Sequence, residues 1–251
     1  MQFNRPIVMS IAGHDPCGGA GLLADIKAFE QNKVYGLGVT TAQTLQTENH
    51  FISIRWESEE NILKAIEQML SHYNIKAVKI GIVQSIETLY KIICVIDDFD
   101  TAINIVIDPV IRSTTEFNFW KEEVDEHLLY NVLRRITLIT PNYKEVVQLV
   151  PAADAKDAAE KISHYCSVLL KGGHNEEEQG VDYLYYNGKV AKLSPGEVTI
   201  YPKHGSGCVL SSAITANIAL GYGLEEACSK AKLYTEKFLT SNPSLLGYHV
   251  S

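Results

Sequence analysis

The chain has 251 residues, of which 46% are hydrophobic, so it can bury a substantial core and is not expected to be disordered. Its 30 acidic and 22 basic residues give a formal net charge of −8. This balance argues against nucleic acid or a membrane surface as the main partner, because no excess of positive charge is present to neutralise phosphates or lipid head groups. A small anionic ligand stays compatible with it, since a single site can be positive on an acidic protein.

The sequence also limits location and organisation. No stretch approaches the length of a membrane span, and the apolar run at residues 7–12 is too short for a signal-peptide core. The five cysteines are an odd number without a CxxC pair, which argues against a disulfide framework or a structural zinc site and favours a reducing cytoplasm. Because no repeat or linker interrupts the sequence, we predict one domain over residues 1–251.

Short apolar segments alternate with helical ones along the chain. The predicted strands cover residues 6–12, 36–42, 76–83, 104–110, 136–142 and 167–173. Helical spacing of apolar residues predicts helices at 20–32, 58–73, 206–221 and 224–241. Several of the strands are apolar throughout rather than alternating, which is typical of strands covered on both faces of a parallel sheet.

An Asn-Gly pair at 187–188 separates two strand-like segments within residues 181–194, which predicts an antiparallel hairpin at one edge of the sheet. We therefore predict a three-layer α/β/α sandwich with a mostly parallel central sheet. In open sheets of this kind, ligands bind outside the carboxyl ends of the strands. The polar residues that follow the predicted strands are accordingly the candidates for function.

The stretch HGSGCVLSSA, residues 204–213, is a Gly-Ser-Gly turn that leads into a helix. The backbone N–H groups of Gly205, Ser206, Gly207 and Cys208 lack intrahelical partners there, and the helix dipole favours negative charge. Such a turn suits a phosphate or a transferring phosphoryl group. The same field is expected to lower the pKa of the Cys208 thiol. An ordinary glycine-rich helix start with a structural cysteine is the alternative.

A second glycine-rich stretch, AGHDPCGGAGLLAD at residues 12–25, also leads from a strand into a helix. It matches neither the GxGxxG dinucleotide fingerprint nor the GxxxxGK[ST] phosphate loop. By itself it favours a glycine turn that only allows close packing of strand and helix.

Together the two stretches resemble the hydroxymethylpyrimidine and phosphomethylpyrimidine kinases of thiamine biosynthesis, which belong to the ribokinase-like superfamily. The family patterns AG-x-DP-x-GGAG-x-x-AD and HGTGC-x-LS-x-A are matched at residues 12–25 and 204–213, with Ser206 in place of threonine. Four shorter matches lie between them in the family's order, namely KIG (79–81), DPV (108–110), TPN-x-x-E (140–145) and KGGH (171–174). The resemblance covers almost the whole chain and implies a ribokinase-like fold and an ATP- and Mg²⁺-dependent kinase.

The resemblance implies that Cys208 and Lys171 take part in phosphoryl transfer. Most ribokinase-like enzymes carry an aspartate at the position of Cys208, where it acts as the base on the acceptor hydroxyl. Cys208 could act as a base or mainly through positioning and charge, while the amides of the turn stabilise the transferring group. Lys171 looks like the family's phosphate-contacting lysine, and a solvated lysine at a strand end is the alternative.

Three residues resemble the group that organises Mg²⁺ and its water shell at the ATP phosphates. Asn142 and Glu145 are three residues apart, on one helical face, directly after a predicted strand, and Asp108 precedes a proline at another strand end. Magnesium keeps several waters and takes few protein ligands, so contacts through water suffice. A simple helix cap by Asn142 is an alternative that does not exclude this role.

For the pyrimidine, the resemblance selects Asp25 and Gln46. A carboxylate can accept from the ring's amino group, and an amide can satisfy both donors and acceptors. Gln43 competes with Gln46, because the alignment depends on the register of residues 40–49. Gly13 and Ile82 are expected to line the faces of the ring.

The chain departs from the family in two loops. His14 and Cys17 replace the small polar residues usual near the first glycines. After DPV the family commonly continues M-x-x-K-SG, whereas residues 111–117 read IRSTTEF and lack that lysine and glycine. This segment is expected to form a flap over the site, where Arg112 could replace the lost charge.

The expected function is phosphorylation of 4-amino-5-hydroxymethyl-2-methylpyrimidine, its monophosphate, or both. A pyridoxine or pyridoxal kinase is the first alternative, because a subgroup of vitamin B6 kinases resembles this family and shares its Gly-x-Gly-Cys turn. A non-catalytic small-molecule binding protein is the second. Members of the family are often dimeric, and the edge hairpin could supply the interface.

Overall fold

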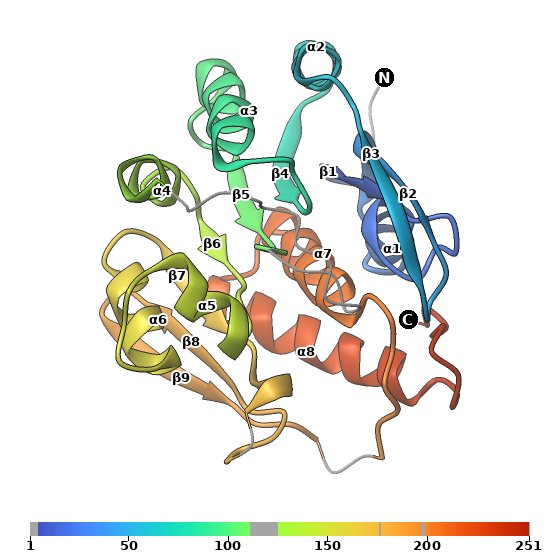
Figure 1. The fold of residues 1–251 in the computed structure, drawn as a ribbon, viewed down its shortest axis with the longest axis vertical. Coiled ribbons are helices and arrows are strands. Elements are labelled where there is room, and N and C mark those ends of the chain that lie inside the picture. The colour runs from blue at the N-terminus through green and yellow to red at the C-terminus, as the bar shows by residue number, and fades with distance from the viewer. Residues whose placement is uncertain (1–4, 111–124, 176, 197–198, 251) are drawn as a thin grey trace.

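The computed structural model describes residues 5–110, 125–175, 177–196 and 199–250. In this part of the chain, the strands form one sheet in the order β3-β2-β1-β4-β5-β6-β7-β8-β9 (Figure 1). The strands are β1 (Ile7–His14), β2 (Tyr35–Gln46), β3 (Phe51–Trp56), β4 (Ile75–Ile80), β5 (Asn104–Ile107), β6 (Leu138–Ile139), β7 (Ser167–Leu170), β8 (Asp182–Tyr186) and β9 (Lys189–Leu193).

Adjacent strands from β2 to β7 run parallel, and antiparallel pairs join β3 to β2, β8 to β7, and β9 to β8. The predicted α/β sandwich with a mostly parallel sheet and an antiparallel edge hairpin is therefore confirmed. At the hairpin tip, Asn187 and Gly188 have φ values of 49° and 70°, the left-handed backbone that an Asn-Gly turn supplies.

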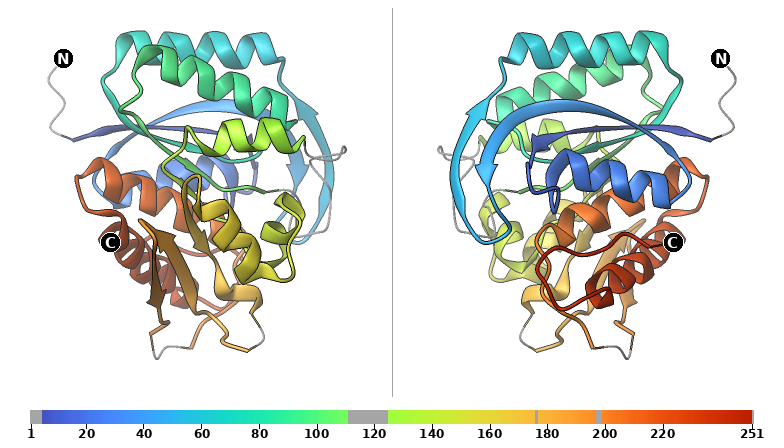
Figure 2. Two further views of the ribbon diagram at one scale, coloured as in Figure 1. Left: turned by 90° about the vertical axis from the view of Figure 1, so that its left-hand side faces the viewer. Right: turned by 90° about the vertical axis from the view of Figure 1, so that its right-hand side faces the viewer.

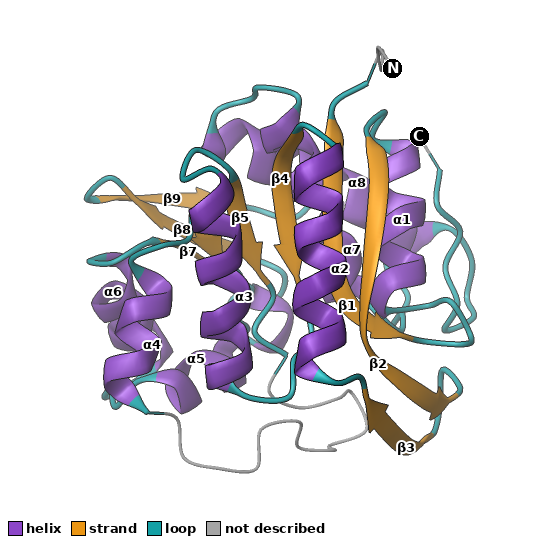
Figure 3. Ribbon diagram, turned by 90° about the horizontal axis from the view of Figure 1, so that it is seen from above, coloured by secondary structure: helices purple, strands orange, loops and turns teal. Residues whose placement is uncertain are grey.

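Helices cover both faces of the sheet (Figures 2 and 3). One face carries α2 (Glu59–His72), α3 (Ile86–Phe99), α4 (Glu126–Leu133), α5 (Tyr143–Leu149) and α6 (Ala155–Ser163). The other face carries α1 (Gly21–Gln31), α7 (Ser206–Ala219) and α8 (Leu224–Thr240). A short 3-10 helix, η1 (Gly172–His174), follows β7.

The alternation of side chains along β5 shows why its apolar run has no polar face. Ile105 and Ile107 are buried in the core under α2 to α6, whereas Val106 is buried in the core under α7 and α8. Successive side chains of a strand point to opposite faces, so a strand covered on both sides must be apolar at every position. The strand prediction from continuous apolar runs depends on this property.

Most predicted elements are present, although the strands predicted at 104–110 and 167–173 end earlier, at Ile107 and Leu170. Two further differences concern β2 and β6. The predicted strand at 36–42 extends to Gln46 and pairs with β3, for which no strand was predicted. The predicted strand at 136–142 is reduced to β6, because Pro141 has no N–H to donate and Asn142 already begins to cap α5. Ser58 caps α2, where its side chain accepts a hydrogen bond from the Asn61 N–H. None of the described helices is long and apolar enough to cross a membrane.

Candidate active site

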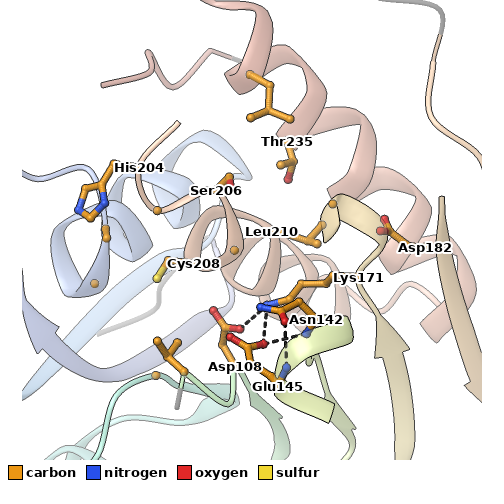
Figure 4. Close-up of a pocket in the computed structure, with 18 of the residues that line it drawn as sticks. Asp108, Asn142, Glu145, Lys171, Asp182, His204, Ser206, Cys208, Leu210 and Thr235 are labelled. Carbon is orange, nitrogen blue, oxygen red and sulfur yellow. Dashed lines mark hydrogen bonds and ion pairs between the residues drawn. The ribbon is translucent and has the colours of Figure 1, made fainter. Parts of the chain in front are cut away.

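A cavity of about 680 Å³ opens beside the carboxyl ends of the parallel strands and the start of α7 (Figure 4). Its wall includes eleven of the twelve residues predicted to belong to the site, namely Gly13, Gln46, Ile82, Asp108, Asn142, Glu145, Lys171, Gly205, Ser206, Gly207 and Cys208. Segments far apart in the sequence thus meet at one place. The position agrees with the rule for ligands in open parallel sheets.

The turn before α7 requires glycine at position 205. Gly205 has a φ of 77°, a left-handed conformation that a residue with a Cβ adopts only at a cost. A Cβ there would also lie 2.0 Å from the carbonyl oxygen of Gly19, so the turn packs directly on the loop after β1. The two glycine-rich stretches are therefore in contact, and together they shape one end of the cavity.

Cys208 lies in the first turn of α7 and lines the cavity, as predicted. The prediction that its thiol has a lowered pKa is wrong: burial raises the pKa of Cys208 to about 11. The carboxylates of Asp25 and Asp108 act in the same direction, whereas the charge of Lys79 and the Gly21 N–H oppose it. The cost of burying a thiolate outweighs the field of the helix terminus at this site.

Lys171 follows β7 and enters a buried cluster of carboxylates (Figure 4). Its Nζ lies 2.7 Å from Asp108 Oδ1 and 3.7 Å from Glu145 Oε2. Burial alone would lower the pKa of Lys171, but these two carboxylates hold it above its usual value, so the ammonium form persists. Burial raises the pKa of Glu145, and the Lys171 charge opposes that shift.

The same ammonium faces the turn before α7. A Cβ added to Gly207 would lie 3.3 Å from Lys171 Nζ and 3.5 Å from Asp108 Oδ2. The absence of a side chain at position 207 thus leaves a space bordered by the ammonium, a carboxylate and the backbone at the start of α7. A transferring phosphoryl group needs donors and positive charge on several sides, which this space offers.

Asn142 is the N-cap of α5. Its side-chain oxygen accepts from the N–H groups of Lys144 and Glu145, and Glu145 Oε2 accepts from the Asn142 N–H at 2.8 Å, which forms a capping box. A parallel bridge joins Asn142 to Lys171. The capping alternative is therefore correct, and the cap also fixes the Glu145 carboxylate beside Lys171.

The residues expected around the substrate ring lie near the end of β2. Ile82 lies against Gly13 so closely that a Cβ on Gly13 would be 2.3 Å from Ile82 Cδ1. Gln46 lines the cavity, whereas Gln43 is not among the lining residues in the described part of the chain. Side chains alternate along a strand, so positions 43 and 46 project to opposite faces of β2. The structure therefore favours Gln46 over Gln43.

Asp25 is the predicted site residue that does not reach the cavity. Its carboxylate is fully buried and accepts from Lys79 Nζ at 2.8 and 3.0 Å, from Ser10 Oγ at 2.5 Å and from Ser212 Oγ at 2.7 Å. These donors occupy both oxygens, so the expectation of a direct contact between Asp25 and a ligand is corrected. The resemblance identified Asp25 as a residue near the site, but its carboxylate binds Lys79 and not a ligand.

Two polar pairs line the cavity for which the sequence predicted no role. Asp15 Oδ2 lies 3.0 Å from His204 Nε2, which ties the loop after β1 to the turn before α7. Burial alone would raise the pKa of Asp15, but hydrogen bonds from His204, Cys17 and the Ala20 N–H hold it at about 2. Burial and the adjacent Asp15 raise the pKa of the Cys17 thiol to about 11, so this thiol stays protonated.

The second overlooked pair closes the opposite side of the cavity. Lys232 on α8 donates to Asp182 Oδ2 at 2.7 Å, and the Gly172 N–H donates to Asp182 Oδ1 at 2.8 Å. A Cβ on Gly172 would meet the Val181 carbonyl oxygen at 1.8 Å, so the KGG sequence allows η1 to pack on β8. The predicted flap at 111–117, with Arg112, lies outside the described residues.

Comparison with known proteins identifies a kinase family over most of the chain. The family model described as "Phosphomethylpyrimidine kinase" matches residues 15–251. A hydroxymethylpyrimidine/phosphomethylpyrimidine kinase of Rhizobium meliloti is 34% identical over 238 residues, which cover 91% of this chain and 88% of that protein.

Solved structures agree in fold. The phosphomethylpyrimidine kinase of Clostridium difficile has a TM-score of 0.77 and 31% identity, covering 92% of this chain and 98% of that one. A pyridoxal kinase from Staphylococcus aureus in complex with ADP has a TM-score of 0.82 and 25% identity, covering 95% of this chain and 89% of that one. From the family model, the sequence identity and the fold, we conclude that the chain belongs to the phosphomethylpyrimidine kinase family of phosphotransferases.

Proposed function

We propose that this protein is an ATP- and Mg²⁺-dependent kinase of thiamine biosynthesis that phosphorylates 4-amino-5-hydroxymethyl-2-methylpyrimidine, its monophosphate, or both. One observation carries the proposal. The Lys171 ammonium, the Asp108 carboxylate and the backbone of Gly207 border one space, in the same cavity as Gln46 and Ile82. A phosphoryl-transfer site and an aromatic-ring site thus share one cavity.

In the proposed reaction, the substrate ring lies against the wall that Gly13 and Ile82 form together, and Gln46 forms hydrogen bonds with its polar edge. Both contacts fit a flat heteroaromatic ring, because the Gly13 backbone has no side chain and Ile82 is apolar. The hydroxymethyl group then points toward Cys208 and the turn. The amides of residues 205–207 and the Lys171 ammonium stabilise negative charge on the transferring phosphoryl group.

The residues present fit a magnesium ion at the nucleotide phosphates. Asp108, Glu145 and Asn142 present oxygen atoms, which magnesium prefers, at the end of the cavity that holds Lys171. They would act through the ion's water shell, and the ion would neutralise phosphate charge. The pyridoxal kinase of Staphylococcus aureus in complex with ADP, a structure of the same fold, supports ATP as the donor.

A pyridoxal kinase is the second candidate, because the pyridoxal kinase of Staphylococcus aureus has the same fold over 95% of this chain. Pyridoxal and the pyrimidine are both flat rings with a hydroxymethyl group, so the same cavity could accept either. Sequence identity favours the pyrimidine, since it is 34% with the relative named for that substrate and 25% with the pyridoxal kinase. A protein that only binds a small molecule would have no reason to keep Lys171 and the turn.

One panel of acceptors tests the proposal. Purified protein with ATP and Mg²⁺ is given hydroxymethylpyrimidine, its monophosphate, pyridoxine or pyridoxal, and ADP release is followed by a coupled assay. We expect the highest kcat/KM with one or both of the pyrimidines. Turnover with only the B6 vitamers would replace the substrate assignment, and no turnover with any acceptor would favour a binding protein. Size-exclusion chromatography with light scattering tests the proposed homodimer.

A further inference from the structure

Lys79 belongs to the KIG motif but has no part in the site described above. Its side chain is fully buried at the end of β4, yet the residue borders the cavity. A Cβ on Gly81 would lie 2.9 Å from Lys79 Nζ. The ammonium therefore lies directly behind the cavity wall that Gly81 forms.

Residues of three other elements hold this ammonium in place. Asp25 on α1 binds it at 2.8 and 3.0 Å, and the Asp25 carboxylate also accepts from Ser10 on β1 and Ser212 on α7. Ser212 is four residues after Cys208, one helical turn along the same helix. The buried ion pair is thus tied to the helix that carries the thiol.

The charges around Cys208 oppose each other. Burial has the largest effect and raises the pKa of the thiol. Lys79 on β4 lowers this pKa, whereas Asp25 on α1 and Asp108 after β5 raise it further. Lys171 after β7 also interacts electrostatically with the thiol. Burial alone would lower the pKa of Lys79, but the Asp25 carboxylate keeps it above its usual value. Lys79 therefore remains an ammonium at any working pH.

We propose that Lys79 is a positioning residue for Cys208: its buried ammonium, bound by the Asp25 carboxylate that Ser212 of α7 also contacts, offsets the cost of forming negative charge on the sulfur. Replacing a buried ion pair with well-packed apolar residues of the same volume is often neutral or stabilising, so stability is a weak explanation for this one. Stabilisation of negative charge at the neighbouring thiol does. The inference rests on the proposed use of Cys208 in catalysis.

The test measures the thiol itself, without turnover. The full-length protein is treated with iodoacetamide at about pH 8.5, near the ordinary pKa of cysteine, and the alkylation rate at Cys208 is measured by peptide mass spectrometry. Three variants are compared with the wild type: Lys79→Met, the double variant Lys79→Met with Asp25→Asn, and Ser10→Ala. The last removes a hydrogen bond of the same network without changing any charge, so it is the matched control.

The proposal predicts that Lys79→Met slows alkylation of Cys208 by about tenfold or more, the change that one pKa unit produces. The double variant is slowed less, because the repulsive carboxylate is gone as well, and Ser10→Ala stays within about twofold of the wild-type rate. A loosened fold would expose the thiol and speed alkylation, so a slower rate cannot come from structural damage. If Lys79→Met does not fold, the alkylation rate of the double variant is compared with the wild-type rate by itself, and a slower rate supports the proposal.

Alkylation at the wild-type rate or faster in the folded Lys79 variants overturns the inference, and so does an equal slowing in Ser10→Ala. Because this readout needs no acceptor and no ATP, it stays valid if the acceptor panel shows no turnover. Failure of the charge coupling and failure of the proposed kinase function are therefore distinguishable.

Discussion

The ammonium of Lys171 faces the backbone of Gly207 so closely that a Cβ added to Gly207 would lie 3.3 Å from Lys171 Nζ. This arrangement brings the end of β7 close to the start of α7, although residues 171 and 207 are 36 positions apart in the sequence. It assembles positive charge and backbone donors at one place. The first prediction tests that arrangement.

Replacing Lys171 with methionine should lower kcat by about 100-fold or more, with a smaller effect on the KM of the acceptor, because the charge acts on the transferring group. Steady-state kinetics with the best acceptor measures this. Lys192→Met, which removes an exposed lysine on β9, is the control and should keep wild-type kinetics. Equal kcat in the two variants would remove Lys171 from the chemistry.

Gly205→Ala should strongly destabilise the protein and abolish turnover. The substitution forces a left-handed residue, at a cost of about 1–2 kcal/mol, and adds a clash with the Gly19 carbonyl oxygen at 2.0 Å. Gly223→Ala is the control, because a Cβ there has no neighbour within 4 Å. Urea unfolding compares the two, and a free energy of unfolding that falls equally in both would show that the turn is not constrained.

Cys208 should make turnover depend on pH. If the thiolate is the reactive form, kcat of the wild type rises with pH from neutral toward the thiol pKa of about 11. Cys208→Ser and Cys208→Ala should each lower kcat much more than they raise KM, and Cys208→Asp should lose the alkaline rise, since a carboxylate is already ionised. Wild-type turnover in Cys208→Ala would show that the sulfur plays no part.

Gln46→Ala should raise the KM for the pyrimidine by about fivefold to tenfold, the effect of losing one hydrogen bond of 1–1.5 kcal/mol, and leave kcat less affected. Gln43→Ala, three residues earlier on the opposite face of β2, should leave both constants unchanged. The same kinetic assay covers both variants. A larger increase of KM in Gln43→Ala than in Gln46→Ala would mean that the ring forms its hydrogen bonds with the other face of β2.

Asp15 should stabilise the protein above pH 4 but not at strongly acidic pH. Its pKa is about 2 in the folded state, below the ordinary 3.8, so the stabilisation is present above the ordinary value and is lost as pH falls toward the folded one. The difference corresponds to about 2 kcal/mol. Urea unfolding at several pH values should show this loss in the wild type and a flatter profile in Asp15→Asn. Identical profiles would contradict the pairing with His204.

The sequence was informative wherever one local rule decides the structure. Continuous apolar runs predicted the parallel strands, Asn187-Gly188 predicted the hairpin, and the glycine turns predicted the helix starts. The pairing of β3 at the edge of the sheet was not predicted, because it depends on how far β2 continues beyond its pairing with β1. Eleven of twelve predicted site residues line one cavity because strand ends of a parallel sheet converge.

The two errors at the site have a common cause. The lowered pKa expected for Cys208 took account of the local helix field but not of burial, which depends on the whole fold. Asp25 was expected to contact the ligand because of its position in the motif. That motif does not reveal the partner of Asp25, which is Lys79, 54 positions away in the sequence. Interactions between buried charges from distant segments are the part that local sequence patterns do not determine.

The central claim is that this cavity transfers the γ-phosphoryl group of ATP to a hydroxymethylpyrimidine. The most direct test incubates the protein with ATP labelled by heavy oxygen in its γ-phosphoryl group, Mg²⁺, and equal amounts of hydroxymethylpyrimidine and pyridoxal, and analyses the products by mass spectrometry. We predict that the label appears mainly in the pyrimidine monophosphate and that Lys171→Met abolishes it. Label found only in pyridoxal phosphate, or in neither product, would contradict the account.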